Sequence, residues 1–333
     1  MNKKLIALAV AASVAAPIVA SADVSVYGVA QMELYSKKLG STTTTNMGDD
    51  YGQSRVGVKW SEDLGGGLAA VGLIELGPNA YKGSTANNTT GLYTRNAHLG
   101  LKGSFGQVVF GTTLQPYKYA GGVKYDAFVA TAAQARGTGG MLGTAFGQNG
   151  YFGNSIAYTG KFGNTKVAVS TSLAENTEAA QYRGHKGDLM AAVTVGLGKG
   201  AEVGVAYAND KYNAVSATSG TSGQTNSKVF GKYTMGPHQI LAQYENHTGN
   251  GAGADSKVMF LGYRFTMGMN KFVVQLGNTD VKGGSTADVK YAAIGAIHNM
   301  SKKTSAFVAY RKTDKNGSTN DETITTVGMK TKF

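Results

Sequence analysis

The sequence predicts an all-β fold, a transmembrane antiparallel β-barrel of 16 strands. Three observations support this prediction. Apolar and polar residues alternate in many successive runs, the connections between the runs are alternately short and long, and the final residues TVGMKTKF keep alternating up to Phe333. A period of two is typical of a sheet with one apolar face. Because lipid offers no water to backbone amides, strands cross a membrane only in a sheet that closes on itself.

The first 22 residues have the pattern of a secretory signal peptide. Lys3 and Lys4 precede an apolar run from Leu5 to Ala16, and residues 20–22 have the small-x-small form of a cleavage site. The run is shorter than the ~20 residues of a spanning helix, which disfavours a membrane anchor. We expect 1–22 to be removed and 23–333 to form the barrel. The net charge of +12 then falls only to +10, because two lysines and no acid are lost.

The alternation begins at Val24 and recurs along the whole remaining chain. The expected short connections are 62–67, 103–106, 160–165, 198–200, 235–238, 266–270 and 299–303. The expected long, polar connections are 36–53, 77–92, 114–153, 174–187, 210–226, 247–255, 280–287 and 314–322. This arrangement predicts short periplasmic turns and long extracellular loops, with strands of the ~9–11 residues that a tilted crossing needs.

The last strand is expected to close the cylinder by pairing with the first, near Val24 to Tyr35. Its apolar side chains would face outward and the alternate positions inward. The expected outward residues are Val327, Met329, Thr331 and Phe333, and the expected inward residues are Gly328, Lys330 and Lys332.

Composition and motifs give no indication of a catalytic, metal-binding or nucleic-acid-binding site. The chain has no cysteine, which excludes disulfides, thiol nucleophiles and thiolate metal sites. Its five histidines lack metal-site spacing, and neither GxSxG nor HExxH occurs. Basic residues without aromatic interleaving give no indication of nucleic-acid binding. We therefore expect no cofactor, no metal, no nucleic-acid partner and no catalytic residues.

At this point the sequence resembles the general porins of the Gram-negative outer membrane. The resemblance is carried by DVSVYGVAQ at 23–31, QSRVGVKWSEDLGGGLAAVGLIELG at 53–77, YTRNAHLGLKGSFGQVVFG at 93–111, MSKKTSAFVAYRK at 300–312 and the terminal Phe333. It implies a homotrimer in the outer membrane that forms a water-filled channel for passive diffusion of small hydrophilic solutes and ions. It also implies that the connection 114–153 folds into the lumen and narrows it.

The resemblance further implies partners. These are other copies of the chain, outer-membrane lipid and lipopolysaccharide, and the barrel assembly machinery, which would recognise the C-terminal strand through Phe333.

Two arginines are the first candidates for selectivity. Arg55 and Arg95 lie near the starts of strands that descend from long loops, so they should lie within ~10 Å of each other across the wall. A charge on the lipid face costs ~2–4 kcal/mol, which favours inward placement. Both match arginines that form a basic cluster facing the loop in the family, and Glu75 between them matches an acid that could pair with both. The alternative is that all three are ordinary lumenal charges of the wall.

The inner loop departs from the family pattern. A third basic member of the cluster falls near Gln148, and the acidic loop motif of several relatives is absent. The loop carries instead Lys118, Lys124, Arg136 and the single acid Asp126. Further bases of the same sign are Lys37, Lys38, Lys59, Lys330 and Lys332. A lumen rich in such groups predicts a weak to moderate anion preference. Alternatively, much of the charge lies in loops that face lipopolysaccharide or solvent.

One stretch conflicts with strict alternation. If Arg95 faces inward, Leu99 and Leu101 should face inward too, and His98 outward. Packing against the inner loop, a subunit contact or a β-bulge could each resolve this conflict.

Two other functions remain as alternatives. A barrel enzyme of phospholipase type would need a Ser/His pair on the lipid-facing wall, at His98 or His298. An exported β-rich adhesin would stay soluble without detergent.

Overall fold

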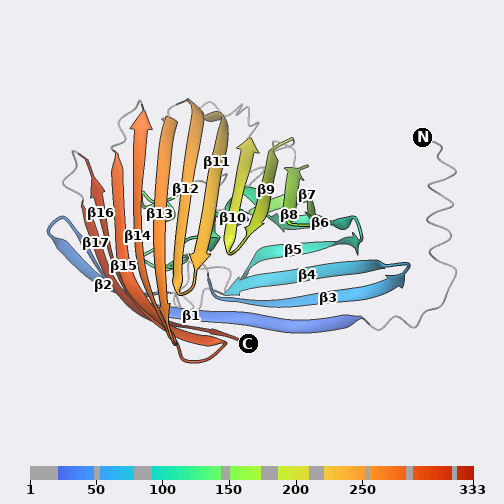
Figure 1. Cartoon of the computed structure of the whole chain (residues 1–333), viewed down its shortest axis with the longest axis horizontal. Coiled ribbons are helices and arrows are strands. Elements are labelled where there is room, and N and C mark those ends of the chain that lie inside the picture. Colours follow the sequence, from blue (N-terminus) through green and yellow to red (C-terminus); the bar gives the residue numbers. More distant parts are fainter. Residues whose placement is uncertain are drawn as a thin grey trace.

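The computed structural model describes residues 22–48, 53–78, 92–143, 151–173, 187–209, 221–251, 255–282, 288–316 and 321–333. Its strands form one antiparallel sheet that curves into a barrel (Figure 1). The strands are β1 (Asp23–Leu39), β2 (Thr42–Gly48), β3 (Arg55–Gly65), β4 (Leu68–Pro78), β5 (Leu92–Gly103), β6 (Gly106–Leu114), β7 (Tyr151–Phe162), β8 (Thr165–Ser172), β9 (Leu189–Gly198), β10 (Ala201–Asn209), β11 (Thr221–Met235), β12 (His238–Gly251), β13 (Asp255–Met267), β14 (Asn270–Lys282), β15 (Val289–Asn299), β16 (Thr304–Lys315) and β17 (Glu322–Lys332).

The seventeen strand segments make a barrel of sixteen, as predicted. β2 pairs with residues 33–39 of β1 and β3 pairs with residues 23–29 of the same strand, so β2 and β3 together occupy one position in the wall. Every other strand pairs with its neighbours in chain order. The seven predicted short connections are all tight turns between adjacent strands.

The prediction of a long connection over 36–53 is wrong for most of its length. Residues 36–39 belong to β1 and residues 42–48 to β2, and the two strands are joined by a tight turn at Gly40, whose φ is 57°. β11 and β12 likewise extend into the predicted connections 210–226 and 247–255. These extensions are polar, so they lack the apolar alternation on which the prediction depended. Threonine favours strands all the same, because its branched side chain suits a pleated backbone.

The barrel closes where the first and last strands meet. β1 pairs with β17 from Val29↔Lys332 to Leu39↔Glu322, and Phe333 continues the ladder by exchanging backbone hydrogen bonds of 3.1 and 3.2 Å with Gly28. The ring of Phe333 covers Gly28 so closely that a Cβ there would come within 2.1 Å of it. Closure between the predicted strands is therefore confirmed, and glycine is the residue that fits beneath the ring.

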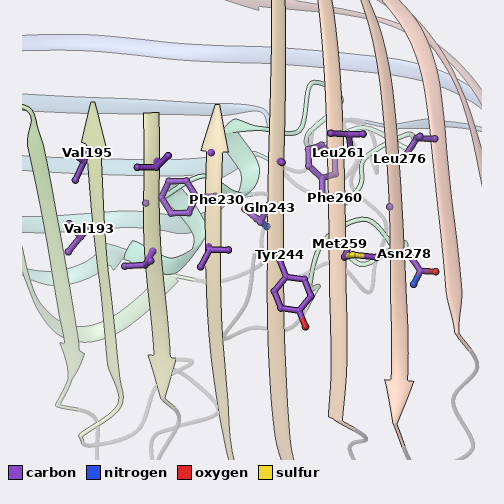
Figure 2. Close-up of a pocket in the computed structure, with 17 residues that line it drawn as sticks. Val193, Val195, Phe230, Gln243, Tyr244, Met259, Phe260, Leu261, Leu276 and Asn278 are labelled. Carbon is purple, nitrogen blue, oxygen red and sulfur yellow. The ribbon is translucent and has the colours of Figure 1, made fainter. Parts of the chain in front are cut away.

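The outer face of the barrel is apolar. Val327, Met329 and Phe333 are more than half exposed on this face, as the sequence predicted. Across β9 to β14 the face is hollowed, with a cavity of about 1010 Å³ (Figure 2). One row of paired residues across this hollow is Val195, Val203, Gly231, Ala242, Leu261 and Leu276. The hollow arises because Gly231 and Ala242 have little or no side chain between larger neighbours.

A β-bulge lies at the point where strict alternation failed. Along β4 and β5, Glu75 pairs with Asn96 and Leu76 pairs with Thr94, which leaves Arg95 as the extra residue. A bulge of this kind shifts the parity of every residue that follows it.

Of the three explanations offered for the conflict in alternation after Arg95, the β-bulge is therefore the correct one. Arg95 and Asn96 are both buried, whereas Leu99 and Leu101 are 57% and 43% exposed. His98 shares the inner face with Asn96 and contacts its Oδ1 at 3.0 Å. The expectation that the leucines face inward and His98 outward is therefore wrong.

The described part of the third long connection, residues 115–143, lies inside the barrel, as expected. It contains α2 (Pro116–Tyr119) and the short 3₁₀ helix η1 (Gly122–Lys124). Its backbone bonds to side chains of β1, β14 and β16, which belong to different parts of the closed wall, so only a position within the lumen reaches all of them. We refer to residues 115–143 as the inner loop. Gln148 lies outside the described residues. None of the helices in the described ranges is long and apolar enough to span a bilayer.

The cost of a charge on the outer face should depend on how deep in the membrane the residue lies. Replacing Leu261, at the middle of β13, by arginine should lower the unfolding free energy by ~2–4 kcal/mol, because the charge would lie in the middle of the hydrocarbon. The same change at Leu197, near the short-turn end of β9, should cost only ~0–1 kcal/mol. Urea unfolding in lipid vesicles measures both values. Equal costs at the two positions would contradict a membrane-spanning band centred on Leu261.

Candidate functional site

A buried carboxylate joins two arginines on the inner wall. Glu75 Oε2 lies 3.1 Å from Arg55 Nε, and its Oε1 accepts a hydrogen bond from Arg95 Nε at 3.0 Å. Tyr27 donates to Oε2 at 2.9 Å. These residues come from β1, β3, β4 and β5, which are adjacent in the wall. Glu75 and Arg95 are 8% and 9% exposed, so the charges interact with little screening.

The local fold explains why the two arginines converge. Arg55 is the first residue of β3, and Glu75 lies opposite Gly57 two residues further along. The bulge in β5 then brings Arg95 onto the inner face beside Glu75. One carboxylate serves two guanidinium groups, so the Arg55–Glu75–Arg95 cluster keeps a net positive charge.

Tyr151 connects this cluster to the inner loop. Arg95 Nη2 donates to Tyr151 OH at 2.7 Å, and Tyr119 OH lies 3.3 Å from the same hydroxyl. Lys118 Nζ lies 4.5 Å from the centroid of the Tyr151 ring, a cation–π distance. Burial raises the pKa of Tyr119 well above its ordinary value, so this loop phenol stays neutral. The cluster therefore includes Lys118, and it connects wall to loop.

Two more lysines lie beside the cluster. Lys59 is exposed, with its Nζ 5.9 Å from the ring centroid of Tyr27. The second is Lys330. When the side-chain amide of Gln53 has its oxygen facing the bases, this oxygen accepts hydrogen bonds from Lys330 Nζ at 3.2 Å and from Arg55 Nη1 at 3.1 Å.

Other carboxylates of the wall hold the inner loop through its backbone. Glu33 accepts from Ala132 N at 2.9 Å, and Arg311 Nη1 donates to Ala132 O at 2.8 Å. Glu245 accepts from Leu142 N at 2.9 Å and from Tyr117 OH at 2.8 Å. Hydrogen bonds to an ionised acceptor are the stronger kind, so these contacts fix the loop against the wall.

Asp126 and Arg136 lie within the packing of the inner loop. Asp126 accepts from Phe128 N at 2.9 Å, from Ala135 N at 2.8 Å and from Gln275 Nε2 at 3.0 Å. Burial raises the pKa of Asp126, although these hydrogen bonds act in the opposite direction. Arg136 Nη2 donates to Gln134 Oε1 at 3.0 Å. Both residues are less than 7% exposed, which gives them an anchoring position within the loop.

The predicted site residues thus fall into three places. Arg55, Glu75, Arg95, Lys59 and Lys118 come together, Asp126 and Arg136 lie inside the loop, and Lys124 lines a separate pocket described below. Sequence reasoning missed the tyrosines and the anchors Glu33 and Glu245. The inward parity of Glu33 and Glu245 was readable, but their partners belong to the inner loop, whose path was not. Among the described residues, no group of three or more His, Cys, Asp or Glu side chains is arranged to hold a metal ion.

Comparison with known proteins gives consistent matches. The family model described as Gram-negative porin matches residues 7–318. Major outer membrane protein P.IB of Neisseria gonorrhoeae is 37% identical over 129 residues, which are 36% of this chain and 34% of the relative. The protein of the same name from Neisseria meningitidis serogroup B is 35% identical over 119 residues, 33% of each chain. The aligned part thus spans about a third of the length of these curated relatives.

Solved structures resemble the whole barrel. The anion-selective porin from Comamonas acidovorans has a TM-score of 0.78 at 20% identity, covering 94% of this chain and 100% of its own. OmpF of Salmonella typhi, in complex with daunomycin, has a TM-score of 0.74 at 15% identity, covering 93% and 97%. The trimer form of OmpT, an outer membrane protein of Vibrio cholerae, has a TM-score of 0.66 at 18% identity, covering 94% and 100%. These similarities show the fold.

The role of Glu75 is testable by a neutral replacement. Glu75→Gln should lower the unfolding free energy by roughly 3 kcal/mol, because Arg55 and Arg95 then face each other without their shared counter-ion. It should also shift the reversal potential in a KCl gradient toward that of chloride, because the lumen loses a negative charge. Tyr27→Phe is the matched control, since it removes one hydrogen bond to Glu75 and no charge. An unchanged reversal potential in Glu75→Gln would show that the cluster lies outside the ion path.

The loop anchors give a second prediction. Glu245→Ala removes the acceptor for Leu142 N and Tyr117 OH, each bond being worth ~1.5–3 kcal/mol. The loop should then move more, and single-channel recordings should show higher open-channel noise and a higher conductance. Glu245→Gln keeps one acceptor oxygen and should give a smaller effect. Recordings identical to the parent for both variants would mean that these contacts do not hold the loop.

Proposed function

Because the chain belongs to the Gram-negative porin family, we propose that it forms a water-filled channel in the outer membrane for passive diffusion of small hydrophilic solutes and ions. The observation that carries the proposal is the closed barrel with an apolar outer face and an inner loop fixed within the lumen. A barrel of sixteen strands is wide enough to leave an aqueous passage beside such a loop. The loop sets the size of that passage, and the wall sets its charge.

The arrangement of charge supports a weak to moderate anion preference. Three described carboxylates of the lumen, Glu33, Glu245 and Asp126, accept hydrogen bonds from the loop backbone, and Glu75 lies between two arginines. Basic side chains such as Lys59 are exposed. Mobile ions therefore meet more accessible positive than negative charge, which favours anions. The solved structure with a TM-score of 0.78 is itself an anion-selective porin, which is in keeping with this proposal.

The two alternative functions receive less support. A barrel enzyme would need a Ser/His pair on the lipid-facing wall, whereas His98 lies on the inner face with Asn96 and His298 contacts Asn270 Oδ1 at 2.8 Å. A soluble adhesin would have no use for the apolar outer face. Membership of the porin family favours a channel over both.

The assembly around the channel is also a proposal. We infer a homotrimer, in keeping with the trimer form of one similar structure. The apolar face would contact outer-membrane lipid and lipopolysaccharide, and the C-terminal strand ending at Phe333 would be recognised by the barrel assembly machinery. Residues 1–22 would be the cleaved signal peptide, and β1 begins directly after them, at Asp23.

Planar-bilayer recording of the purified protein tests this function. We expect conductance to rise in groups of three equal steps, and the reversal potential in a KCl gradient to show chloride preferred over potassium. Lys59→Gln should reduce that preference, because it removes an exposed charge of the inner face without touching the loop anchors. The absence of current would refute the channel, and potassium selectivity would refute the anion preference.

A further inference from the structure

A second group of basic residues lies near the short-turn end of the barrel. Lys166 is the second residue of β8, and Lys232 and Arg264 each lie three residues before the end of their strands. Together with Lys124 of η1 they line a cavity of about 300 Å³ between the inner loop and the wall. We refer to this cavity as the turn-side pocket. None of the residues of the Arg55–Glu75–Arg95 cluster lines it.

The turn-side pocket has an excess of positive charge. Its four basic side chains face one acid, Glu202. The Glu202 carboxylate lies 3.6 Å from Lys232 Nζ and accepts a hydrogen bond from Tyr125 OH at 3.3 Å. One carboxylate balances one of the four bases, so the lining keeps a net charge of +3.

Arg264 fixes the loop side of the pocket. Its Nη2 donates to Tyr125 O at 2.6 Å and to Lys124 O at 3.3 Å, and its Nη1 donates to Gln239 Oε1 at 3.1 Å. These bonds hold the backbone of η1 against β12 and β13, while the side chain of Lys124 stays exposed. Its ammonium group is nevertheless partly desolvated, which lowers the pKa of Lys124, and repulsion from Lys166 and Lys232 lowers it further, against the attraction of Glu202. The ammonium groups are thus close enough to repel one another.

We propose that the turn-side pocket is a binding site for a small doubly charged oxyanion, with the size and charge of inorganic phosphate. This inference rests on the proposed function, because the ion reaches the site through the lumen. A dianion would offset two of the three excess charges, and Lys124, Lys166 and Lys232 would supply its charge-assisted hydrogen bonds. The cavity lies at the lower end of the ~300–1,000 Å³ typical of ligand pockets, which suits a small ion.

The site is suited to transit as well as binding. Lys124 and Lys166 are exposed, so the bound ion keeps contact with water and is released readily. Conduction needs sites that attract an ion without retaining it. The pocket would therefore enrich dianions at the short-turn end of the channel while they compete with chloride for the path.

Block of chloride current by inorganic phosphate tests the site. The probe is added to the short-turn side at mildly alkaline pH, where phosphate is mostly doubly charged. In the parent channel, phosphate should reduce the chloride current in a concentration-dependent way. Lys124→Gln/Lys166→Gln should raise the half-blocking concentration by about tenfold per lysine, the loss expected for one charge-assisted hydrogen bond each. Arg264 is left intact because it holds the loop.

The matched control is Lys302→Gln/Lys303→Gln. It removes the same charge from an exposed short turn, outside the residues that line the pocket, and its block should equal that of the parent. Equal half-blocking concentrations in the parent and the pocket variant, or no block of the parent, would overturn the site. The KCl reversal potential of the parent channel, measured separately, tests the anion preference. Failure of the anion preference and failure of the turn-side pocket as a phosphate site can therefore be told apart.

Discussion

The wall of this protein depends on one constraint, that no backbone amide in hydrocarbon finds a partner outside the protein. Sixteen antiparallel strands meet this constraint only if the first and last are joined, and the β1–β17 ladder joins them. Phe333 exchanges both of its backbone bonds with Gly28 and covers it with its ring. The closure therefore needs a strand of fixed parity up to the last residue, and a glycine where the aromatic ring crosses the neighbouring strand.

Closure creates a second requirement inside the barrel. The inner loop carries backbone N–H groups into the lumen without a strand partner, and buried donors of this kind must be satisfied. Glu33, Glu245 and Asp126 accept from them. Anchoring the loop thus occupies carboxylates that would otherwise attract cations. The electrostatic character of the passage follows from how the loop is held, and the proposed anion preference would need no separate arrangement of charge.

Much of this could be predicted from the sequence, because a period of two reports which face of a strand is apolar. The strand count, the short turns and the closing strand follow from that signal alone. The threonine-rich β2 gave no such signal, since its polar residues do not alternate with apolar ones. The alternation revealed a conflict after Arg95 but not its cause, because the bulge is defined by the pairing of β5 with Glu75 and Leu76. The resemblance brought Arg55, Glu75 and Arg95 together, but the anchors depended on the path of the loop.

The inner loop also relates the two basic regions to each other. Tyr119 lies 3.3 Å from Tyr151, which bonds to Arg95, and it also lines the turn-side pocket. Lys118 and Lys124 belong to consecutive short helices of the same loop, one beside Tyr151 and one in the pocket. Under the proposed function, an anion that leaves the first region would meet the second on the same loop. Two weak binding sites in series conduct ions faster than one tight site, because an ion bound at one site helps to displace the ion at the other. Glu245 holds Tyr117, which precedes Lys118, and Arg264 holds the backbone at Lys124, so loosening the loop at both anchors would disturb both regions.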